Sequence, residues 1–237
     1  MADRHRQYRP GAAINGYERI AGRYNKLHAR FLRVSGCAAQ AAVEAAILVS
    51  ANRNAKVLDA GCGTGALAQR LLEHQPGLQL TLLDASPSML REARGIKARR
   101  VHGSITQLPF SSGAFDLSIA SWVLETVRDP AKAVRELVRV TRPGGLVGVV
   151  FCAVRNDTDI FDGLVEASIR LRGTGRFLQE SVVRSALLDA GCARILTLPS
   201  RGPAIALIAE VCRSGITSLA GEAAVKSDAI RSCAACS

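Results

Sequence analysis

Apolar positions near the start of the chain recur at helical spacing. Between Ile14 and Arg33 an apolar side chain returns every three or four residues, while arginines and a lysine occupy the opposite face. This pattern predicts a basic amphipathic helix. A second helix is expected over Gln40–Ala51, before a short polar break at Asn52–Asn54.

From Lys56 onward, short β-branched or leucine-rich runs alternate with helical stretches. The expected strands are Val57–Asp59, Leu78–Asp84, Arg99–His102, Asp116–Ala120, Leu146–Phe151, Ala193–Leu198 and Ile205–Val211. The expected helices between them are Ala66–His74, Pro87–Arg94, Pro130–Thr141 and Glu180–Asp189. Apolar strands that alternate with helices are typical of a mostly parallel sheet covered on both faces. The predicted fold class is therefore α/β, with a doubly wound sheet.

No long linker or internal repeat divides the 237 residues. We expect one domain over residues 1–213, which includes N-terminal helices at 14–51 and an insertion at 156–175 after the fifth strand, where substrate specificity is expected. The Ser-, Ala- and Gly-rich residues 214–237 predict a weakly ordered tail. No apolar run approaches the roughly 20 residues of a membrane span, and no secretory signal is visible. The expected location is cytoplasmic, either soluble or peripheral to a membrane.

Composition narrows the class of protein without identifying a partner. Hydrophobic residues make up 48% of the chain and charged residues 22%, which are values of a globular protein. The net charge of +11 favours anionic partners but does not choose among nucleic acid, phospholipid and acidic substrates. Five of the seven cysteines lack metal-ligand spacing, and Cys233 and Cys236 form a single C-x-x-C with no second pair and no nearby histidine, so we expect mostly reduced, buried thiols and no metal site.

The strongest local signal is the segment Val57–Gly65, in which a buried strand runs into three alternating glycines and then a helix. Glycines allow a sharp turn and let a ligand approach the main chain closely. The last glycine follows the second by two residues instead of three, so the spacing does not reproduce the pyrophosphate cradle of a dinucleotide site. Asp84 ends the next strand, where its carboxylate can accept hydrogen bonds from two ribose hydroxyls or, alternatively, cap the following helix.

Further motifs follow in order, and together they resemble the class I S-adenosylmethionine-dependent methyltransferases. They are Leu108-Pro109-Phe110, Phe115-Asp116, Leu124, Asp129-Pro130, Arg135-Glu136, Arg139-Val140 and Pro143-Gly144-Gly145. Within the family, the ubiquinone/menaquinone-biosynthesis-like branch of small-molecule enzymes is most similar, over about Tyr17 to Val211. The resemblance implies a seven-stranded sheet whose last strand is antiparallel. It also implies a lid helix carrying Tyr17-x-x-x-Ala21-x-x-Tyr24, with the second tyrosine near the cofactor.

The loop, the acid and the resemblance together define an expected S-adenosylmethionine site. Its residues are Tyr24, Asp59, Gly61, Cys62, Gly63, Gly65, Asp84, Ala85, Met89, Ser104, Ile105 and Ser121. Met89 and its neighbour Leu90 either flank the adenine or belong to the core. Two positions depart from the family pattern: Ser104 stands where an acid usually accepts from the adenine amino group, and Asn25 stands where the tyrosine motif commonly ends in an acid. Ser104 can still accept a hydrogen bond, although more weakly, or the adenine rests on the backbone around Ser104 and Ile105.

Methyl transfer from a sulfonium is an in-line displacement, for which the protein mainly supplies alignment and desolvation. The segment Ser121–Glu125 should face the transferred methyl group. It contains no Asn/Asp-Pro-Pro-Tyr sequence of the kind that holds an exocyclic base nitrogen. Glu125, His28 and Tyr24 are conceivable bases, but each also has an ordinary structural interpretation, so no catalytic residue is assigned.

Three functions remain open at this point. The preferred hypothesis is an enzyme that methylates O, C or N of a small or lipid-like molecule, with a membrane-derived acceptor suggested by the basic helix. A second hypothesis is an RNA or protein methyltransferase that docks through its basic surface, although few aromatic residues are left for base stacking. A third is a non-catalytic module that binds the cofactor, prompted by Ser104 and by the lack of an obvious base.

Overall fold

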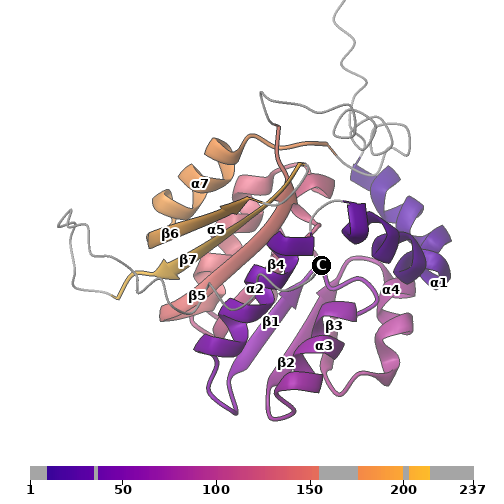
Figure 1. Ribbon diagram of the computed structural model, residues 1–237, viewed down its shortest axis with the longest axis horizontal. Coiled ribbons are helices and arrows are strands. Elements are labelled where there is room, and N and C mark those ends of the chain that lie inside the picture. Colours follow the sequence, from indigo (N-terminus) through magenta and orange to yellow (C-terminus); the bar gives the residue numbers. More distant parts are fainter. Residues whose placement is uncertain (1–9, 35–36, 155–175, 200–202, 214–237) are drawn as a thin grey trace, which may run out of the picture.

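The computed structural model describes residues 10–34, 37–154, 176–199 and 203–213 (Figure 1). One seven-stranded sheet runs through it in the order β3-β2-β1-β4-β5-β7-β6. Strands β1 to β5 are mutually parallel, and β7 is antiparallel to both β5 and β6. The strands are β1 Lys56–Ala60, β2 Gln79–Asp84, β3 Arg99–His102, β4 Phe115–Ser121, β5 Thr141–Cys152, β6 Cys192–Pro199 and β7 Ala204–Val211. The predicted doubly wound sheet with one antiparallel strand is confirmed.

Helices cover both faces of this sheet. They are α1 Pro10–Val34, α2 Cys37–Ser50, α3 Ala66–His74, α4 Pro87–Glu92, α5 Pro130–Val140 and α7 Glu180–Asp189, with short 3-10 turns η1 Ala93–Gly95 and η2 Leu124–Thr126. Asp129 caps α5, because its carboxylate accepts from the Lys132 amide at 2.8 Å and Pro130 starts the helix. Ser86 caps α4 in the same way by accepting from the Met89 amide.

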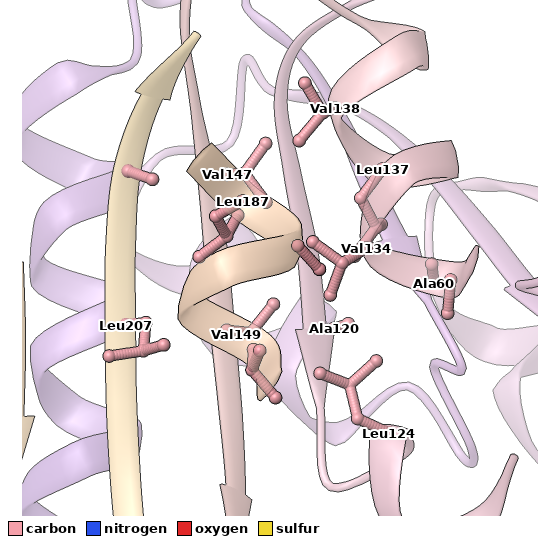
Figure 2. Close-up of a cluster of buried hydrophobic side chains, with 14 of the residues drawn as sticks. Ala60, Ala120, Leu124, Val134, Leu137, Val138, Val147, Val149, Leu187 and Leu207 are labelled. Carbon is pink, nitrogen blue, oxygen red and sulfur yellow. The ribbon is translucent and has the colours of Figure 1, made fainter. Parts of the chain in front are cut away.

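Successive strand residues alternate between two buried clusters, one on each face of the sheet. On one face α5 and α7 pack on β4, β5 and β7, where Val134, Leu187, Val149 and Leu207 are fully buried (Figure 2). On the other face α2 and α3 pack on the sheet, with Val43 among the buried side chains. Burial of large aliphatic side chains stabilises the fold by roughly 1.5–3 kcal/mol each. The sheet is thereby a rigid platform for the loops at its strand ends.

The sheet order reverses between β1 and β4, which are hydrogen-bonded neighbours although β2 and β3 lie between them in sequence. The chain leaves β1 toward one edge of the sheet and leaves β4 toward the other. In open α/β sheets ligands bind in the crevice beyond the carboxyl ends of the strands at such a reversal. The candidate site lies there.

Several element boundaries differ from the sequence prediction. Helices α1 and α2 begin earlier, at Pro10 and Cys37 instead of Ile14 and Gln40. Strand β5 begins at Thr141 instead of Leu146, because Thr141 already pairs with Phe115; the chain then passes through an irregularity, with Gly144 at a φ of 72°, before the pairing resumes at Leu146 opposite Leu117. Gly145 is required there, since a Cβ would lie 2.4 Å from the Asp116 carbonyl oxygen. Helix α4 ends at Glu92 and the chain tightens into η1 instead of continuing to Arg94.

Several expectations lie outside the described residues, namely the insertion at 156–175 and the tail at 214–237. The single-domain assignment stays a prediction. No helix in the described part of the chain is long and apolar enough to cross a membrane. Cys62, Cys152 and Cys192 are buried free thiols, as expected, whereas Cys212 is exposed.

Candidate cofactor site

A pocket of about 450 Å³ opens at the carboxyl ends of β1 to β4 and is covered from one side by α1. Nine of the twelve expected cofactor residues line it: Tyr24, Gly61, Gly63, Asp84, Ala85, Met89, Ser104, Ile105 and Ser121. The loops that follow four different strands therefore converge on one cavity, although the residues are spread over almost 100 positions. Asp59, Cys62 and Gly65 support the pocket without lining it.

The glycine loop is shaped by backbone that other residues adopt with difficulty. Gly61, Gly63 and Gly65 all have positive φ, at 79°, 54° and 79°. A Cβ on Gly65 would lie 2.3 Å from the Ile96 side chain, which makes this glycine a packing requirement at the start of α3. At Gly63 the nearest atom to a Cβ would be Tyr24 Cε1 at 3.6 Å, so main chain faces open pocket there.

Asp84, at the end of β2, holds the glycine loop in place by hydrogen bonding. Its Oδ2 accepts a hydrogen bond from the Gly63 amide and its Oδ1 accepts one from the Ser86 amide, both at 2.8 Å. Both oxygens thus orient the loops around the pocket, and each keeps a lone pair for a further donor. Ser86, not Asp84, caps the following helix.

A second carboxylate, Asp59, lies beneath the glycine loop at the end of β1 and is 2% exposed. Its Oδ2 is buried without a hydrogen-bond partner among the described residues. Burial raises the pKa of Asp59 to about 7, and the neighbouring Asp84 carboxylate adds to the rise. Burial also raises the pKa of Asp84 itself. The region beside the loop is therefore short of positive charge.

The loop after β3 differs from the family pattern, and the structure shows how its serine is used. The Ser104 hydroxyl lies 2.8 Å from the Thr106 hydroxyl and accepts from the Thr106 amide at 3.2 Å. Ser104 thus stabilises its own turn and lines the pocket at the same time. Met89 is 2% exposed, so it belongs both to the core and to the pocket wall.

The lid helix α1 is fixed to the pocket at two points that sequence reasoning missed. Glu18 accepts hydrogen bonds from the Ser86 hydroxyl at 2.5 Å, from the Ser88 amide at 3.1 Å and from the Ser88 hydroxyl. These bonds lower the pKa of Glu18 to about 2. One turn past Ala21, Asn25 accepts from the Thr64 hydroxyl of the glycine loop.

The signal for the first contact was present in the sequence, because Glu18 is one of two acids among eight basic residues before Val34. At the second contact the amide oxygen of Asn25 accepts from a hydroxyl donor, as a carboxylate at this position also could. On the same helix, the rings of Tyr17 and Tyr24 lie edge to face with their centres 5.9 Å apart, and both residues line the pocket.

The segment after β4 turns sharply at Trp122, whose φ of 60° is rare for a bulky residue. Its backbone amide donates to the Val150 carbonyl and its indole N–H to Gln40 Oε1, both at 2.8 Å. This turn sets Val123 against Gly61, and it leaves the Ser121 hydroxyl oxygen buried without a partner among the described residues. Strained backbone of this kind costs about 1–3 kcal/mol and persists at functional sites.

Two of the three conceivable bases are not suited to take a proton from an acceptor. Glu125 is buried and not solvated: its Oε1 accepts from the Cys152 amide at 2.8 Å, and it does not line the pocket. Burial raises the pKa of Glu125 to about 7. Burial, together with nearby carboxylates, raises the pKa of the Tyr24 phenol, so it stays protonated at neutral pH. The side chain of His28 lies outside the described residues.

These features fit S-adenosylmethionine. A positively charged sulfonium and ammonium match a region where the Asp59 and Asp84 carboxylates are buried and repel each other. The Asp59 and Ser121 oxygens that have no partner among the described residues can accept hydrogen bonds. Gly63 lets the ligand approach main chain, and Asp84 stands at the strand end where a ribose is held.

Comparisons with known proteins agree with this geometry. A family model described as "Methyltransferase domain" matches residues 58–149. A malonyl-[acyl-carrier protein] O-methyltransferase of Pectobacterium atrosepticum is 34% identical over 190 residues, which cover 78% of this chain and 68% of the relative. A demethylmenaquinone methyltransferase of Thermus thermophilus is 38% identical over 101 residues, covering 40% of this chain and 46% of the relative. Apart from the Pectobacterium protein, the chain spans 38% to 52% of the length of the curated relatives it matches.

Solved structures share the fold at low sequence identity. A methyltransferase from Thermotoga maritima superposes with a TM-score of 0.63 at 18% identity, covering 84% of this chain and 99% of that one. Human N-acetylserotonin methyltransferase, solved with S-adenosylmethionine, gives 0.58 at 19% identity, covering 72% and 52%. The chain therefore belongs to the class I S-adenosylmethionine-dependent methyltransferases, in their small-molecule branch.

Proposed function

We propose that this methyltransferase transfers the methyl group of S-adenosylmethionine to O, C or N of a small or lipid-like molecule. The observation that carries the proposal is the extent of the pocket lining. Besides the glycine loop and the end of β4, the lining includes Ile14, Tyr17 and Val127, which are not among the expected cofactor residues. A second reactant can therefore lie beside the cofactor under the lid helix.

In this proposal the chain's residues position the cofactor and exclude water. The bound cofactor supplies a methyl group on a sulfonium sulfur, which is left as a neutral thioether when the acceptor attacks. Asp84 would hold the ribose hydroxyls, and Met89 and Ile105 would flank the adenine. Asp59 would face the methionine ammonium from beneath the loop, and Tyr24 would close the site from α1. Alignment of two reactants in a dry site accounts for a large share of the rate of such displacements.

The pocket wall favours an acceptor that needs little help in losing a proton. Its described lining contains no histidine and no glutamate, and its aspartates are already engaged: Asp84 by two amides and Asp129 as the cap of α5. Relatives are named for a malonyl carboxyl borne on a carrier protein and for quinol-type rings. Ionised carboxylates and acidic ring hydroxyls meet this requirement, so these two classes are the first acceptors to test.

Calorimetric titration with S-adenosylmethionine and S-adenosylhomocysteine tests the cofactor part. We expect the intact protein to bind both, Asp84→Ala to lose at least tenfold in affinity, and the exposed Asp189→Ala variant to bind normally. Transfer of an isotopically labelled methyl group to malonyl carrier protein and to a demethylated quinol then tests the acceptor class. An intact protein that binds neither form of the cofactor would contradict the proposal, and binding without transfer to any acceptor would favour a non-catalytic module.

A further inference from the structure

A row of exposed cations follows the chain from α4 through η1 to β3. We name it the cationic ridge, and it consists of Arg91, Arg94, Lys97, Arg99 and Arg100. Glu92 is the only acid between residues 91 and 102. Strand β3 is the outermost strand of the sheet, so the ridge occupies a free edge of the molecule (Figure 1).

Several arginines outside the ridge are paired with carboxylates. These ion pairs are Arg70–Glu44, Arg135–Asp129, Arg139–Glu136, Arg142–Asp116, Arg184–Glu180 and Arg194–Glu210. No ridge residue forms such a pair within the described part of the chain. Like charges that stand together unpaired repel one another, and an anionic partner would relieve this repulsion.

Local contacts hold part of the ridge in place. The Arg100 guanidinium lies 3.3–3.5 Å from the carbonyl oxygens of four residues between Ala93 and Ala98, which ties the charge to the loop before β3. Arg91 donates to the Ser88 hydroxyl. Glu18 on the contacting helix α1 is engaged by Ser86 and Ser88, and its charge also attracts Arg91. Local contacts therefore hold the positive charge in place, and Glu18 offsets part of it at Arg91 alone among the described ridge residues.

The ridge borders the cofactor pocket. Helix α4 carries Met89 in the pocket wall, and β3 leads directly into Ser104 and Ile105, which line it. His102 Nε2 lies 3.1 Å from the Ala85 carbonyl oxygen and joins the two sides. A macromolecule seated on the ridge would lie beside the cavity in which the proposed reaction takes place.

The chemistry of the ridge favours a folded acidic protein over a membrane or a nucleic acid. The exposed large hydrophobic side chains among the described residues all lie outside residues 85–112, so the ridge has none to insert into lipid. The aromatic rings that line the same surface hollow as Lys97 and Arg99 are Phe110 and Phe115, and they pack edge to face on each other at 5.0 Å instead of presenting a stacking surface. Charge without apolar anchors suits steering and orientation of an oppositely charged protein.

We propose that the cationic ridge is the docking surface for a small acidic protein that presents the methyl acceptor to the pocket. The inference rests on the proposed function, because it assigns the partner that delivers the acceptor. It also gives a role to five charges that the cofactor site leaves unused.

The test compares two double charge reversals that change net charge equally. Arg94→Glu with Lys97→Glu alters the ridge, whereas Arg194→Glu with Arg213→Glu alters exposed cations of β6 and the end of the chain after β7, at the opposite edge of the sheet. Each protein is titrated with malonyl-loaded acyl carrier protein at low and moderate salt, with phosphatidylglycerol vesicles, with transfer RNA, and with S-adenosylhomocysteine.

We expect the carrier protein to bind the wild-type chain in a salt-dependent manner, at least tenfold more weakly to the ridge variant, and within twofold of wild type to the control. Equal affinities of all three proteins for S-adenosylhomocysteine would show that the pocket is intact. Carrier binding that the ridge variant retains, or ridge-dependent binding of vesicles or RNA without carrier binding, overturns the docking proposal. Absence of S-adenosylhomocysteine binding by the wild type would instead count against the proposed function, so the two failures are distinguishable.

Discussion

Two glycines of the loop after β1 share left-handed backbone but differ in the space around them. A Cβ on Gly61 would lie 2.5–2.9 Å from three atoms of Val123, whereas on Gly63 its nearest neighbour would be 3.6 Å away. We expect Gly61→Ala to destabilise the ligand-free protein by about 2–4 kcal/mol, through left-handed strain and overpacking. Gly63→Ala should cost only about 1–2 kcal/mol of strain.

The Gly61→Ala and Gly63→Ala substitutions should also differ in their effect on cofactor affinity. Because Gly63 faces the pocket, its added methyl group should weaken S-adenosylhomocysteine binding at least tenfold in protein that remains folded. Denaturant unfolding and calorimetry on both variants measure the two effects. Equal destabilisation by the two substitutions would show that the contact between Gly61 and Val123 is not tight.

The buried Asp59 carboxyl gives the ligand-free protein a specific pH dependence. Its pKa is about 7 in the folded protein and about 3.9 in an unfolded chain. A raised pKa contributes stability that is fully present below about pH 4 and is lost as pH rises through 7. Relative to Asp59→Asn, the wild type should therefore lose about 2–4 kcal/mol of unfolding free energy between pH 4 and pH 8.

The measurement is denaturant unfolding of both proteins across this pH range, without cofactor. The constant cost of burying an asparagine amide cancels, because only the change with pH is compared. The exposed Asp189→Asn variant is the control and should follow the wild type. Parallel profiles for wild type and Asp59→Asn would mean that Asp59 titrates normally.

At the scale of elements, α1 is held to the domain by polar contacts at its inner face. Glu18 bonds to the start of α4 and Asn25 to the glycine loop, while Arg19, Arg23 and Lys26 are exposed. Glu18→Ala should therefore loosen α1 without unfolding the sheet, seen as faster amide exchange in α1 and an unchanged exchange rate in β4 and β5. Arg19→Ala is the matched control on the exposed face.

The same contact predicts the direction of a pH effect on the lid. The pKa of Glu18 is lowered to about 2, so its contribution is present above the unfolded value near 4.3 and is lost as pH falls toward 2. Exchange in α1 should accordingly speed up on acidification in the wild type but not in Glu18→Ala. If exchange in α1 depended on pH in the same way in both proteins, Glu18 would not be the residue that anchors α1.

The elements themselves could be predicted from sequence because their determinants are local. Apolar strands, proline-initiated helices and polar breaks located almost every strand and helix within a few residues. One boundary that failed depends on a distant contact: β5 extends to Thr141 because Thr141 pairs with Phe115. Likewise Arg139 and Glu136 were recognised as family motif residues, but only the structure shows them holding the loop at Leu108 and Phe110.

The site was predictable where function requires an unusual residue type, and missed where it needs only a common one. Three alternating glycines and a strand-end aspartate are rare enough in combination to be found. Glu18 and Gln40 are ordinary helix residues whose partners, Ser86 and the Trp122 indole, lie more than 65 positions away. The burial of Glu125 could not be predicted for the same reason, since Glu125 accepts from the Cys152 amide at the end of β5.

At the scale of the whole molecule, the two buried clusters share a single sheet, so they should unfold together. Cofactor bound only to the folded state stabilises it by about 2.7 kcal/mol at a concentration 100 times Kd. For a chain of this length this corresponds to a rise in Tm of roughly 5–10 °C. We therefore expect one thermal transition that S-adenosylhomocysteine moves upward by this amount.

The Asp84→Asn variant tests whether the ligand-induced rise in Tm depends on the Asp84 carboxylate. Asparagine keeps an oxygen that can accept from one of the two amides, but its NH2 group faces the other amide donor to donor, so the ligand-free Tm should fall by several degrees. The loss of charge and of one acceptor should abolish most of the ligand-induced rise. The measurement is thermal unfolding monitored by circular dichroism, with each protein measured with and without ligand. Two separate transitions in the wild type would mean that the clusters unfold independently. A full ligand-induced rise in Asp84→Asn would place the ribose elsewhere in the pocket, because a strand-end carboxylate that binds two hydroxyls cannot be replaced without loss.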